Sequence, residues 1–360
     1  DLAYRELNFP RALGRRADVR AHKRKNMAGK LLVTGGAGYV GSHCCRAFAE
    51  AGWDVTVFDN LSTGWRDLVK WGPLIVGDLQ DPADLNAAFE KVKPDAVAHF
   101  AGSALVAESV REPSIYYRNN TLATLNLLEA MRRHGAGYLI FSSTCAIFGQ
   151  AQADTIREDH PKNPINPYGM SKLMVEQILR DFDAAHGIRS IPLRYFNAAG
   201  ADRDAKTGER HACETHVIPL AMKGAYDAGY EFTILGSDFD TPDGTAIRDY
   251  IHVEDLAEAH LRALTALENG AASAAYNLGT GRGTSVAEVV SAIERATNRK
   301  IPRRYGPRRP GDPAKLIALP DKARQELGWT ATRSDVDNII RSALRWHEKD
   351  WAETAALDKA

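Results

Sequence analysis

The sequence predicts an α/β fold in which a doubly wound parallel sheet is followed by a smaller α/β domain. Six short apolar runs, separated by segments with helical periodicity, are the first observation. They cover residues 31–33, 54–59, 74–76, 96–100, 138–141 and 190–195. They are continuously apolar rather than alternating, which is typical of parallel strands buried on both faces. The second observation is a change of amino-acid composition from Asn197 onward, where residues 200–210 are rich in Gly, Asp and Lys.

The first run leads through a glycine-rich turn directly into a helix. Residues 35–41 read GGAGYVG and contain the spacing G-x-G-x-x-G. This spacing lets backbone amides and a helix N-terminus meet a pyrophosphate. Gly36 and Gly38 are expected to let the backbone approach the phosphates, and Gly41 to let the helix pack closely on its strand. The alternative is a tight turn that binds no ligand.

The second strand ends at Asp59, close to the spacing of about 20 residues at which a carboxylate binds the adenine ribose of NAD. An acid at this position repels the 2′-phosphate of NADP, which favours NAD. Arg66 lies nearby and could accommodate that phosphate, so NADP stays an alternative.

The remaining strands follow at the spacing of βαβ units, with helices expected over 82–91, 121–133 and 167–186. This order predicts a Rossmann domain over 30–200 that binds NAD, to which the chain returns around 252–270. We expect residues 201–350 to form the smaller domain, which closes over the carboxyl ends of the strands and binds the substrate. We interpret residues 1–29 as a disordered leader. A targeting peptide is the alternative, disfavoured by the acidic residues of this segment.

Composition excludes several other classes of protein. The 360 residues are 44% hydrophobic and 26% charged, and the formal net charge is zero, which argues against nucleic acid as a partner. No apolar run approaches the roughly 18 residues of a membrane span. Four cysteines without a C-x-x-C pair favour a reduced, cytoplasmic protein. His211 and His216 lack further ligands at suitable sequence spacing, so no metal is expected.

Tyr168 and Lys172 lie four residues apart near the start of the helix over 167–186, with Asn166 as the expected N-cap and Pro167 at the first helical position. This spacing places the phenol and the ammonium on one helix face. Lowering the pKa of a tyrosine from about 10 to about 7 requires roughly 4 kcal/mol of phenolate stabilisation. Lys172 and a positive nicotinamide ring are expected to supply it. The alternative is an ordinary surface pair.

The triplet Ser142-Ser143-Thr144 follows the strand over 138–141, at the sheet edge where ligands bind. A hydroxyl there could share a hydrogen bond with the substrate oxygen and Tyr168, although a turn that only caps the strand is the alternative. The glycine loop, the acid, these hydroxyls and the Tyr/Lys pair form a more specific signal together than separately.

In this order the motifs resemble the extended short-chain dehydrogenase/reductase family, and within it the nucleotide-sugar epimerases, over roughly residues 30–347. The stretches that carry the resemblance include TGGAGYVGSH, DNLSTG, HFAG, FSST, NPYGMSKL, LRYFNAAG and RRPGD. The resemblance implies a tightly held NAD and the interconversion of UDP-glucose and UDP-galactose through a transient 4-keto sugar. It also implies a homodimer formed through the helices over 121–133 and 167–186.

The resemblance assigns catalytic roles to Tyr168, which takes the proton of the sugar 4-hydroxyl, and to Lys172 and Thr144. The residues it places at the cofactor are Gly35, Gly38, Tyr39, Val40, Gly41, Asp59, Asn60, Asp78, Leu79, Phe100, Ala101, Asn119, Ser142, Tyr168, Lys172 and Tyr195. Those it places at the UDP-sugar are Thr144, Tyr168, Asn197, His216, Val217, Arg248, Arg309, Asp312 and Leu316.

Three positions depart from the usual pattern of the family. Thr144 replaces a serine, Ala104 replaces a lysine that contacts the cofactor, and Leu316 has intermediate bulk where size is linked to acceptance of N-acetylated sugars. UDP-N-acetylglucosamine and UDP-xylose or UDP-arabinose therefore remain alternative substrates. A dehydratase would need acids where Cys145 and Ala146 stand. A non-catalytic nucleotide sensor would need neither Tyr168 nor Lys172.

Overall fold

The computed structural model describes residues 29–150, 153, 155–309 and 312–357. The leader expected over 1–29 lies outside these residues, apart from its last position. Within the described part, no helix is long and apolar enough to cross a membrane. Cys44, Cys45 and Cys145 are buried, Cys213 is exposed, and all four are free thiols.

A seven-stranded parallel sheet forms the larger part of the molecule, in the order β11-β6-β5-β4-β1-β2-β3. This confirms the predicted fold class. The strands are β1 (Lys30–Thr34), β2 (Asp54–Asp59), β3 (Leu74–Val76), β4 (Ala96–His99), β5 (Tyr138–Thr144), β6 (Arg189–Tyr195) and β11 (Tyr276–Leu278).

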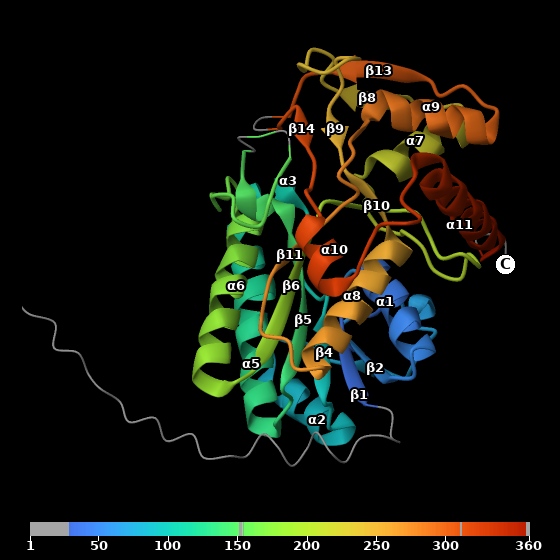
Figure 1. Cartoon of the computed structure of the whole chain (residues 1–360). Helices are drawn as coiled ribbons and strands as arrows, with labels where there is room; N and C mark the ends of the chain where they lie inside the picture. The colour runs from blue at the N-terminus through green and yellow to red at the C-terminus, as the bar shows by residue number, and fades with distance from the viewer. Residues whose placement is uncertain (1–28, 151–152, 154, 310–311, 358–360) are drawn as a thin grey trace, which may run out of the picture.

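Helices cover both faces of this sheet, as Figure 1 shows with α5 and α6 on one side and α1 and α8 on the other. One face packs under α1 (Tyr39–Glu50), α8 (Val253–Glu268) and α10 (Asp321–Leu327), and includes Trp329. The opposite face packs under α2 (Pro82–Val92), α5 (Ala123–His134) and α6 (Pro167–His186). Burial on both faces explains why the strands read as continuous apolar runs.

The seventh strand, β11, was not among the six runs recognised in the sequence. It is only three residues long, too short for a periodicity to reveal, and it pairs with β6 through Tyr276, Asn277 and Leu278. Together with α8 and α10 it joins the core of the sheet. The chain therefore returns to the sheet at several points after residue 200.

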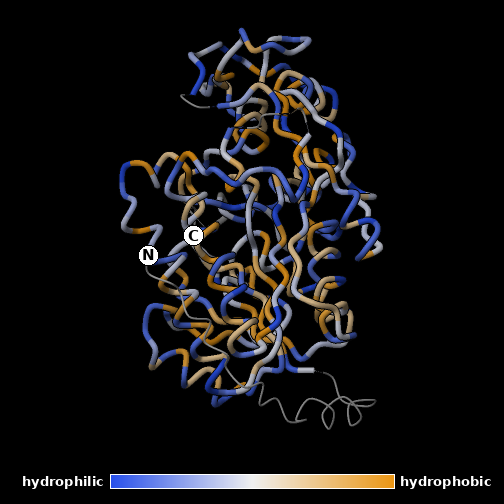
Figure 2. The backbone as a smooth tube through the Cα atoms, turned by 60° about the vertical axis from the view of Figure 1, so that its left-hand side comes forward, coloured by the Kyte–Doolittle hydropathy of each residue, from blue (hydrophilic) through white to orange (hydrophobic). Residues whose placement is uncertain are grey.

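The smaller part packs around a core of its own, built by α7 (Val217–Tyr226), α9 (Val286–Thr297) and α11 (Val336–Leu357). Short strands complete it: β7 (Asn197–Ala199), β8 (Phe232–Leu235), β9 (Ile247–Arg248), β10 (Tyr250–His252), β12 (Thr284–Ser285), β13 (Arg303–Gly306) and β14 (Lys315–Leu316). Figure 2 shows hydrophobic segments running through the interior of both parts, with hydrophilic segments at the periphery.

Short helical turns lie at the edge of the sheet where the carboxyl ends of the strands meet. They are α3 (Val106–Arg111), α4 (Pro113–Tyr116), a π-helical turn at Tyr117–Leu122, and 3-10 turns at Arg66–Leu68 and Cys145–Phe148. The strand order reverses between β1 and β4, and ligands of open α/β sheets bind in the crevice at such a point. This edge is therefore where the site should be sought.

Candidate active site

The glycine loop joins the end of β1 to α1 in a geometry suited to an anion. Gly35 adopts a φ of +74°, a left-handed conformation that favours glycine. A Cβ on Gly41 would lie 2.2 Å from the carbonyl oxygen of Gly35, so only glycine lets α1 start this close to its strand. No side chain caps the first turn of α1, and that turn holds no acid. Its free backbone amides form a ready anion-binding site.

Two of these glycines have different roles. A Cβ on Gly36 would lie 2.9 Å from both Cγ atoms of Val57, so Gly36 is needed for packing on β2. That it also lets phosphates approach stays a prediction. A Cβ on Gly38 would meet only the carbonyl oxygen of Gly35, at 3.3 Å. Gly38 has an ordinary extended conformation, with φ at −88°. Its small size leaves space on the open side of the loop.

Asp59 ends β2 beside this loop. Its carboxylate accepts hydrogen bonds from the backbone amides of Ala37, at 3.0 Å, and Leu61, at 2.8 Å. Burial raises the pKa of Asp59, and the two amides partly counter this. Further along the same edge, the side chain of Asn60 donates to Asp78 at 3.1 Å, and Leu79 is buried under the sheet. These four predicted residues thus lie together.

The side chains of Tyr39 and Val40 point into the protein. The Tyr39 hydroxyl donates to the carbonyl of Gly200 at 2.6 Å, and Val40 packs against the core of the sheet. Only their backbone amides, at the start of α1, are therefore available to bind a dinucleotide.

Tyr168 is brought to the end of β5 by the first turn of α6. The Asn166 side chain accepts a hydrogen bond from the Gly169 amide at 2.8 Å and Pro167 begins the helix, as predicted. A Cβ on Gly169 would lie 2.5 Å from the carbonyl oxygen of Ala146, so this glycine lets α6 touch the turn after β5. Burial raises the pKa of Tyr168 to about 12, while a hydrogen bond with Thr144 acts in the opposite direction.

Lys172 is buried one turn further along α6. Its Nζ donates to the carbonyl of Ser142 at 3.0 Å and lies 4.8 Å from the ring centroid of Phe141. Desolvation lowers the pKa of Lys172 to about 8, so the ammonium stays mostly protonated at neutral pH. An ammonium has three N–H donors. Donors therefore remain for a polar ligand.

The ends of β4, β5 and β6 supply the other predicted cofactor residues. Ser142 and Tyr195 share a short hydrogen bond between their hydroxyls. Phe100 and Ala101 follow β4, where the amides of both donate to the carbonyl of Thr34. The side chain of Asn119 donates to Ser103 Oγ at 2.9 Å and lies in the π-helical turn, a feature frequent at functional sites.

Sequence reasoning missed two groups that hold this edge together. Asn120 is buried and donates to the Ser171 hydroxyl at 2.9 Å and the Ser103 carbonyl at 3.0 Å, which links the loop after β4 to α6. Glu176 pairs with Arg194 at 2.6 Å, with both side chains almost fully buried, and accepts a hydrogen bond from the Ser143 hydroxyl at 2.7 Å. The sequence pair Asn119-Asn120 could have pointed to the contacts of Asn120. No sequence signal pointed to the Glu176–Arg194 pair.

Four of the predicted substrate residues lie beside the turn after β5. Arg248 on β9 forms an ion pair with Asp312, and it is close enough to Cys145 to influence the pKa of that thiol. The Asn197 amide donates to the carbonyl of Asp249 at 3.1 Å. Leu316 packs against the cluster that contains Cys145 and Phe148. Arg248 and Leu316 thus lie beside the turn that follows Thr144, and Asp312 is held there by Arg248.

Three more predicted substrate residues lie in the loop before Asp312 and at the start of α7. Arg309 is exposed, and its carbonyl accepts a hydrogen bond from the Asp312 amide at 3.1 Å. His216 is the residue before α7 and Val217 is its first residue. Burial alone would lower the pKa of His216, but hydrogen bonds with Glu209 and Glu214 outweigh it and raise the pKa to about 10.

The same two carboxylates lie near the start of α1. Burial raises the pKa of Tyr39, and the nearby charges of Glu209 and Glu214 raise it further. From the sequence no metal was expected, because His211 and His216 lack further ligands at suitable spacing. The fold brings Glu209 and Glu214 to them, and the pattern E-x-H-x-x-E-x-H is the signal that could have revealed the group.

The described residues fit a bound dinucleotide. The uncapped amides of α1 and the open side of Gly38 suit a diphosphate, and the buried Lys172 keeps donors available at the far end of the same edge. Asp59 ends β2, which lies on the opposite side of β1 from β5 and Lys172, and it suits a ribose diol.

Comparison with known proteins agrees with this geometry. The UDP-glucose 4-epimerase of Rhizobium leguminosarum bv. trifolii is 50% identical over 324 residues, which cover 90% of this chain and 99% of the relative. The crystal structure of UDP-glucose 4-epimerase from Brucella ovis in complex with NAD is similar, with a TM-score of 0.86 and 48% identity over 89% of this chain and 98% of that one. The enzyme from Bifidobacterium longum in complex with NAD+ and UDP has a TM-score of 0.83 and 39% identity, over 89% of this chain and 98% of that one.

Residues 31–279 match the sequence profile of a family that unites such enzymes, and this span includes the glycine loop, Tyr168 and Lys172. With the profile over most of the chain and relatives at 50% identity over nearly their full length, this chain belongs to the NAD dependent epimerase/dehydratase family.

Proposed function

We propose that the protein is an NAD-dependent UDP-glucose 4-epimerase, which interconverts UDP-glucose and UDP-galactose. The observation that carries the proposal is the position of Tyr168, hydrogen-bonded with Thr144 at the carboxyl end of β5, with Lys172 buried one turn away. This is an acid/base group at the edge where the fold binds its ligands.

Tyr168 takes the proton of the sugar 4-hydroxyl and later returns a proton to the same oxygen. NAD, when bound, supplies a hydride acceptor and donor for C4, so the reaction passes through a transient 4-keto sugar without net oxidation. Thr144 orients the sugar oxygen toward the phenol. Lys172 stabilises the phenolate through its charge and, because its ammonium has donors to spare, also holds the nicotinamide ribose.

The cofactor site proposed here follows the sheet edge. The amides of Tyr39 and Val40, beside Gly38, bind the diphosphate, and Asp59 binds the adenine ribose. The other residues proposed to line it are Gly35, Gly41, Asn60, Asp78, Leu79, Phe100, Ala101, Asn119, Ser142 and Tyr195.

The UDP-sugar is proposed to lie across the turn after β5, toward the smaller part. Arg248 and Arg309 bind its diphosphate, because a guanidinium contacts two oxygens at once. Asp312 orients Arg248 through their ion pair. Asn197, His216, Val217 and Leu316 complete this proposed site.

A dehydratase of the same family is not favoured. Cys145 is buried, and burial raises the pKa of its thiol to about 12, so it cannot act as an acid/base group at neutral pH. Ala146 carries no ionisable group. Glu176, the carboxylate nearest to Ser143, is held by Arg194.

A homodimer and a cytoplasmic location are also proposed. Large hydrophobic side chains are exposed on the π-helical turn, α5 and α6, among them Leu122, Leu125 and Met174. Such a patch marks an interaction surface. The free thiols fit a reducing compartment, where the proposed activity would serve galactose metabolism.

A panel assay tests the function. Purified protein is incubated without added reductant with UDP-glucose, UDP-N-acetylglucosamine or UDP-xylose, and the 4-epimers are separated by chromatography. We expect UDP-galactose to form fastest. Preferential turnover of another sugar would reassign the substrate, and a dehydrated product or no turnover would refute the proposal.

A further inference from the structure

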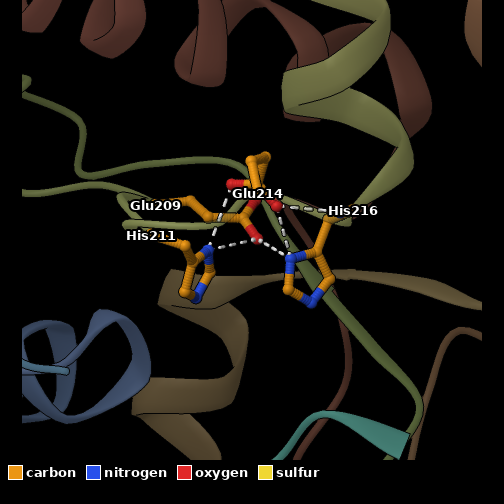
Figure 3. Close-up of side chains that lie close together, drawn as sticks. All are labelled: Glu209, His211, Glu214 and His216. Carbon is orange, nitrogen blue, oxygen red and sulfur yellow. Dashed lines mark hydrogen bonds and ion pairs between the residues drawn. The ribbon is translucent and has the colours of Figure 1, made fainter. Parts of the chain in front are cut away.

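The loop that precedes α7 brings two histidines and two glutamates together. Figure 3 shows the four side chains, Glu209, His211, Glu214 and His216, pointing toward one another. His216 Nδ1 lies 3.0 Å from Glu209 Oε1 and 2.7 Å from Glu214 Oε1. His211 Nδ1 lies 3.1 Å from Glu214 Oε2 and 3.7 Å from Glu209 Oε1. One ligand atom from each of the four residues lies within 4.8 Å of the others.

These distances match what a tetrahedral cation requires. Nitrogen and oxygen ligands at about 2.0–2.1 Å from Zn²⁺ stand ~3.3 Å from one another. Three of these four separations are shorter than this value, one is longer, and every pair of ligand atoms lies within 4.8 Å, so a cation fits after side-chain shifts of up to about 1 Å. We propose that Glu209, His211, Glu214 and His216 form a binding site for a divalent transition-metal cation, with Zn²⁺ as the best match.

Charge and burial support the site. The Glu209 side chain is only 7% exposed, and a buried carboxylate needs a counter-charge. Arg210 does not provide it, because its guanidinium pairs with Asp67 and Asp350. Without a metal the imidazolium of His216 provides it, at 3.0 Å, and a divalent cation would replace its proton. Two glutamates and two neutral imidazoles carry two negative charges, which one divalent cation cancels. Mixed imidazole and carboxylate ligands suit zinc.

The site has a route of entry. A cavity of about 460 Å³ lies beside it, lined by Glu209, His211 and Glu214 on one side and by residues of α7 and α11 on the other. Four protein ligands fill a tetrahedral shell, which is typical of structural sites. The bound cation therefore fastens residues 209–211 to the start of α7. Its role is structural and does not depend on the proposed epimerase reaction, and His216, which is also a proposed UDP-sugar residue, is left unchanged in the test.

Metal titration of the full-length, tag-free protein tests the proposal. The protein is first treated with a chelator and then titrated with Zn²⁺ by calorimetry and with Co²⁺ by absorption spectroscopy. We expect equimolar binding, visible Co²⁺ bands of tetrahedral intensity without thiolate charge transfer, and a Tm raised by about 3 °C or more at saturating Zn²⁺.

Four variants locate the site, two at proposed ligands and two as controls. His211→Ala and Glu214→Gln should each weaken Zn²⁺ binding by about 100-fold or more and abolish the Tm shift. Cys213→Ser, in the same loop, and His186→Ala, at the exposed end of α6, should bind Zn²⁺ like the unmodified protein. Circular dichroism without metal checks that each variant is folded.

Several results would overturn the proposal. These are a lack of equimolar binding, binding that survives in His211→Ala and Glu214→Gln, or binding lost in Cys213→Ser. The cluster would then be an imidazolium–carboxylate network that holds no cation. Because metal binding is measured without substrate, this outcome is independent of whether the protein epimerises UDP-glucose.

Discussion

Tyr168 transfers the proton in the proposed reaction, and to act as a base at neutral pH its pKa must be lowered. Even from its reference value of about 10, bringing the pKa to neutrality requires roughly 4 kcal/mol. Burial increases that demand, since it raises the pKa to about 12 in the chain alone. The charges of Lys172 and the nicotinamide ring must therefore be in place before Tyr168 can act as a base.

Replacing Tyr168 by phenylalanine removes the hydroxyl and leaves the ring. We expect the rate of UDP-galactose formation to fall at least about 100-fold, the usual contribution of general acid/base catalysis. Tyr305→Phe is the matched control, because Tyr305 is exposed on β13. A Tyr168→Phe enzyme with normal turnover would exclude this residue as the base.

Lys172→Met tests the electrostatic role of the ammonium. Loss of a positive charge raises the pKa of Tyr168, so less phenolate is present at any given pH. The acid limb of the pH–rate profile should move to higher pH, with a loss of rate at neutral pH of up to about 10-fold for each unit by which the pKa of Tyr168 rises. The profile is measured between pH 6 and 10 on protein whose NAD content has been checked. An unchanged acid limb would contradict the role, whereas Lys172→Arg should restore part of the rate.

At the scale of an element, the turn between β1 and α1 must both let the helix pack closely on its strand and leave space for a ligand. Gly35 and Gly41 allow the helix to begin directly behind the strand, and Gly38 keeps the space in front of the helix clear. The two demands can be separated, because a methyl group at Gly41 strikes backbone and one at Gly38 extends toward the proposed diphosphate.

Gly41→Ala and Gly38→Ala should therefore have opposite signatures. Gly41→Ala should lower the free energy of unfolding by about 1–3 kcal/mol, since the methyl group cannot be accommodated without moving backbone. Gly38→Ala should change it by about 1 kcal/mol or less, yet lower the amount of NAD retained on purification. Chemical denaturation and cofactor content after protein precipitation measure the two effects. Equal loss of NAD and of stability in both variants would show that the loop acts only through folding.

At the scale of the whole molecule, two features surround the large sheet: the smaller part, and an apolar surface on α5 and α6. The smaller part stands over the carboxyl ends of the strands, as Figure 1 shows. On the flank, α5 and α6 expose Leu125, at 36%, and Met174, at 41%. Apolar exposure on neighbouring helices indicates association with another protein surface, and a second copy is the simplest partner.

The double substitution Leu125→Glu and Met174→Glu should convert a dimer to monomers, because it buries like charges against each other in a two-fold interface. Sedimentation velocity at several concentrations measures the change. Val76→Glu, on the edge strand β3 and also exposed, should leave the dimer intact. If the unmodified protein sediments as a monomer, the dimer proposal is wrong.

Much of the fold could be predicted because its signals are local. The glycine loop, the Asn166 cap with Pro167, and the apolar runs of β1 to β6 each depend on residues close together in the chain. β11 could not be predicted this way, because the three residues Tyr276, Asn277 and Leu278 become a strand only by pairing with β6. The π-helical turn before α5 likewise left no signal in the helical periodicity.

For the candidate site, the sequence by itself determined which chemical groups end each strand, since strand ends are marked by composition: Asp59, Ser142 and Thr144 follow apolar runs directly. Only the tertiary structure decided which distant groups meet. It paired Arg248 with Asp312, enclosed Glu176 with Arg194, turned Gly36 toward Val57, and brought Glu209 and Glu214 to two histidines. The physical reason is that burial and charge pairing depend on distances across the folded chain, which local sequence patterns do not contain.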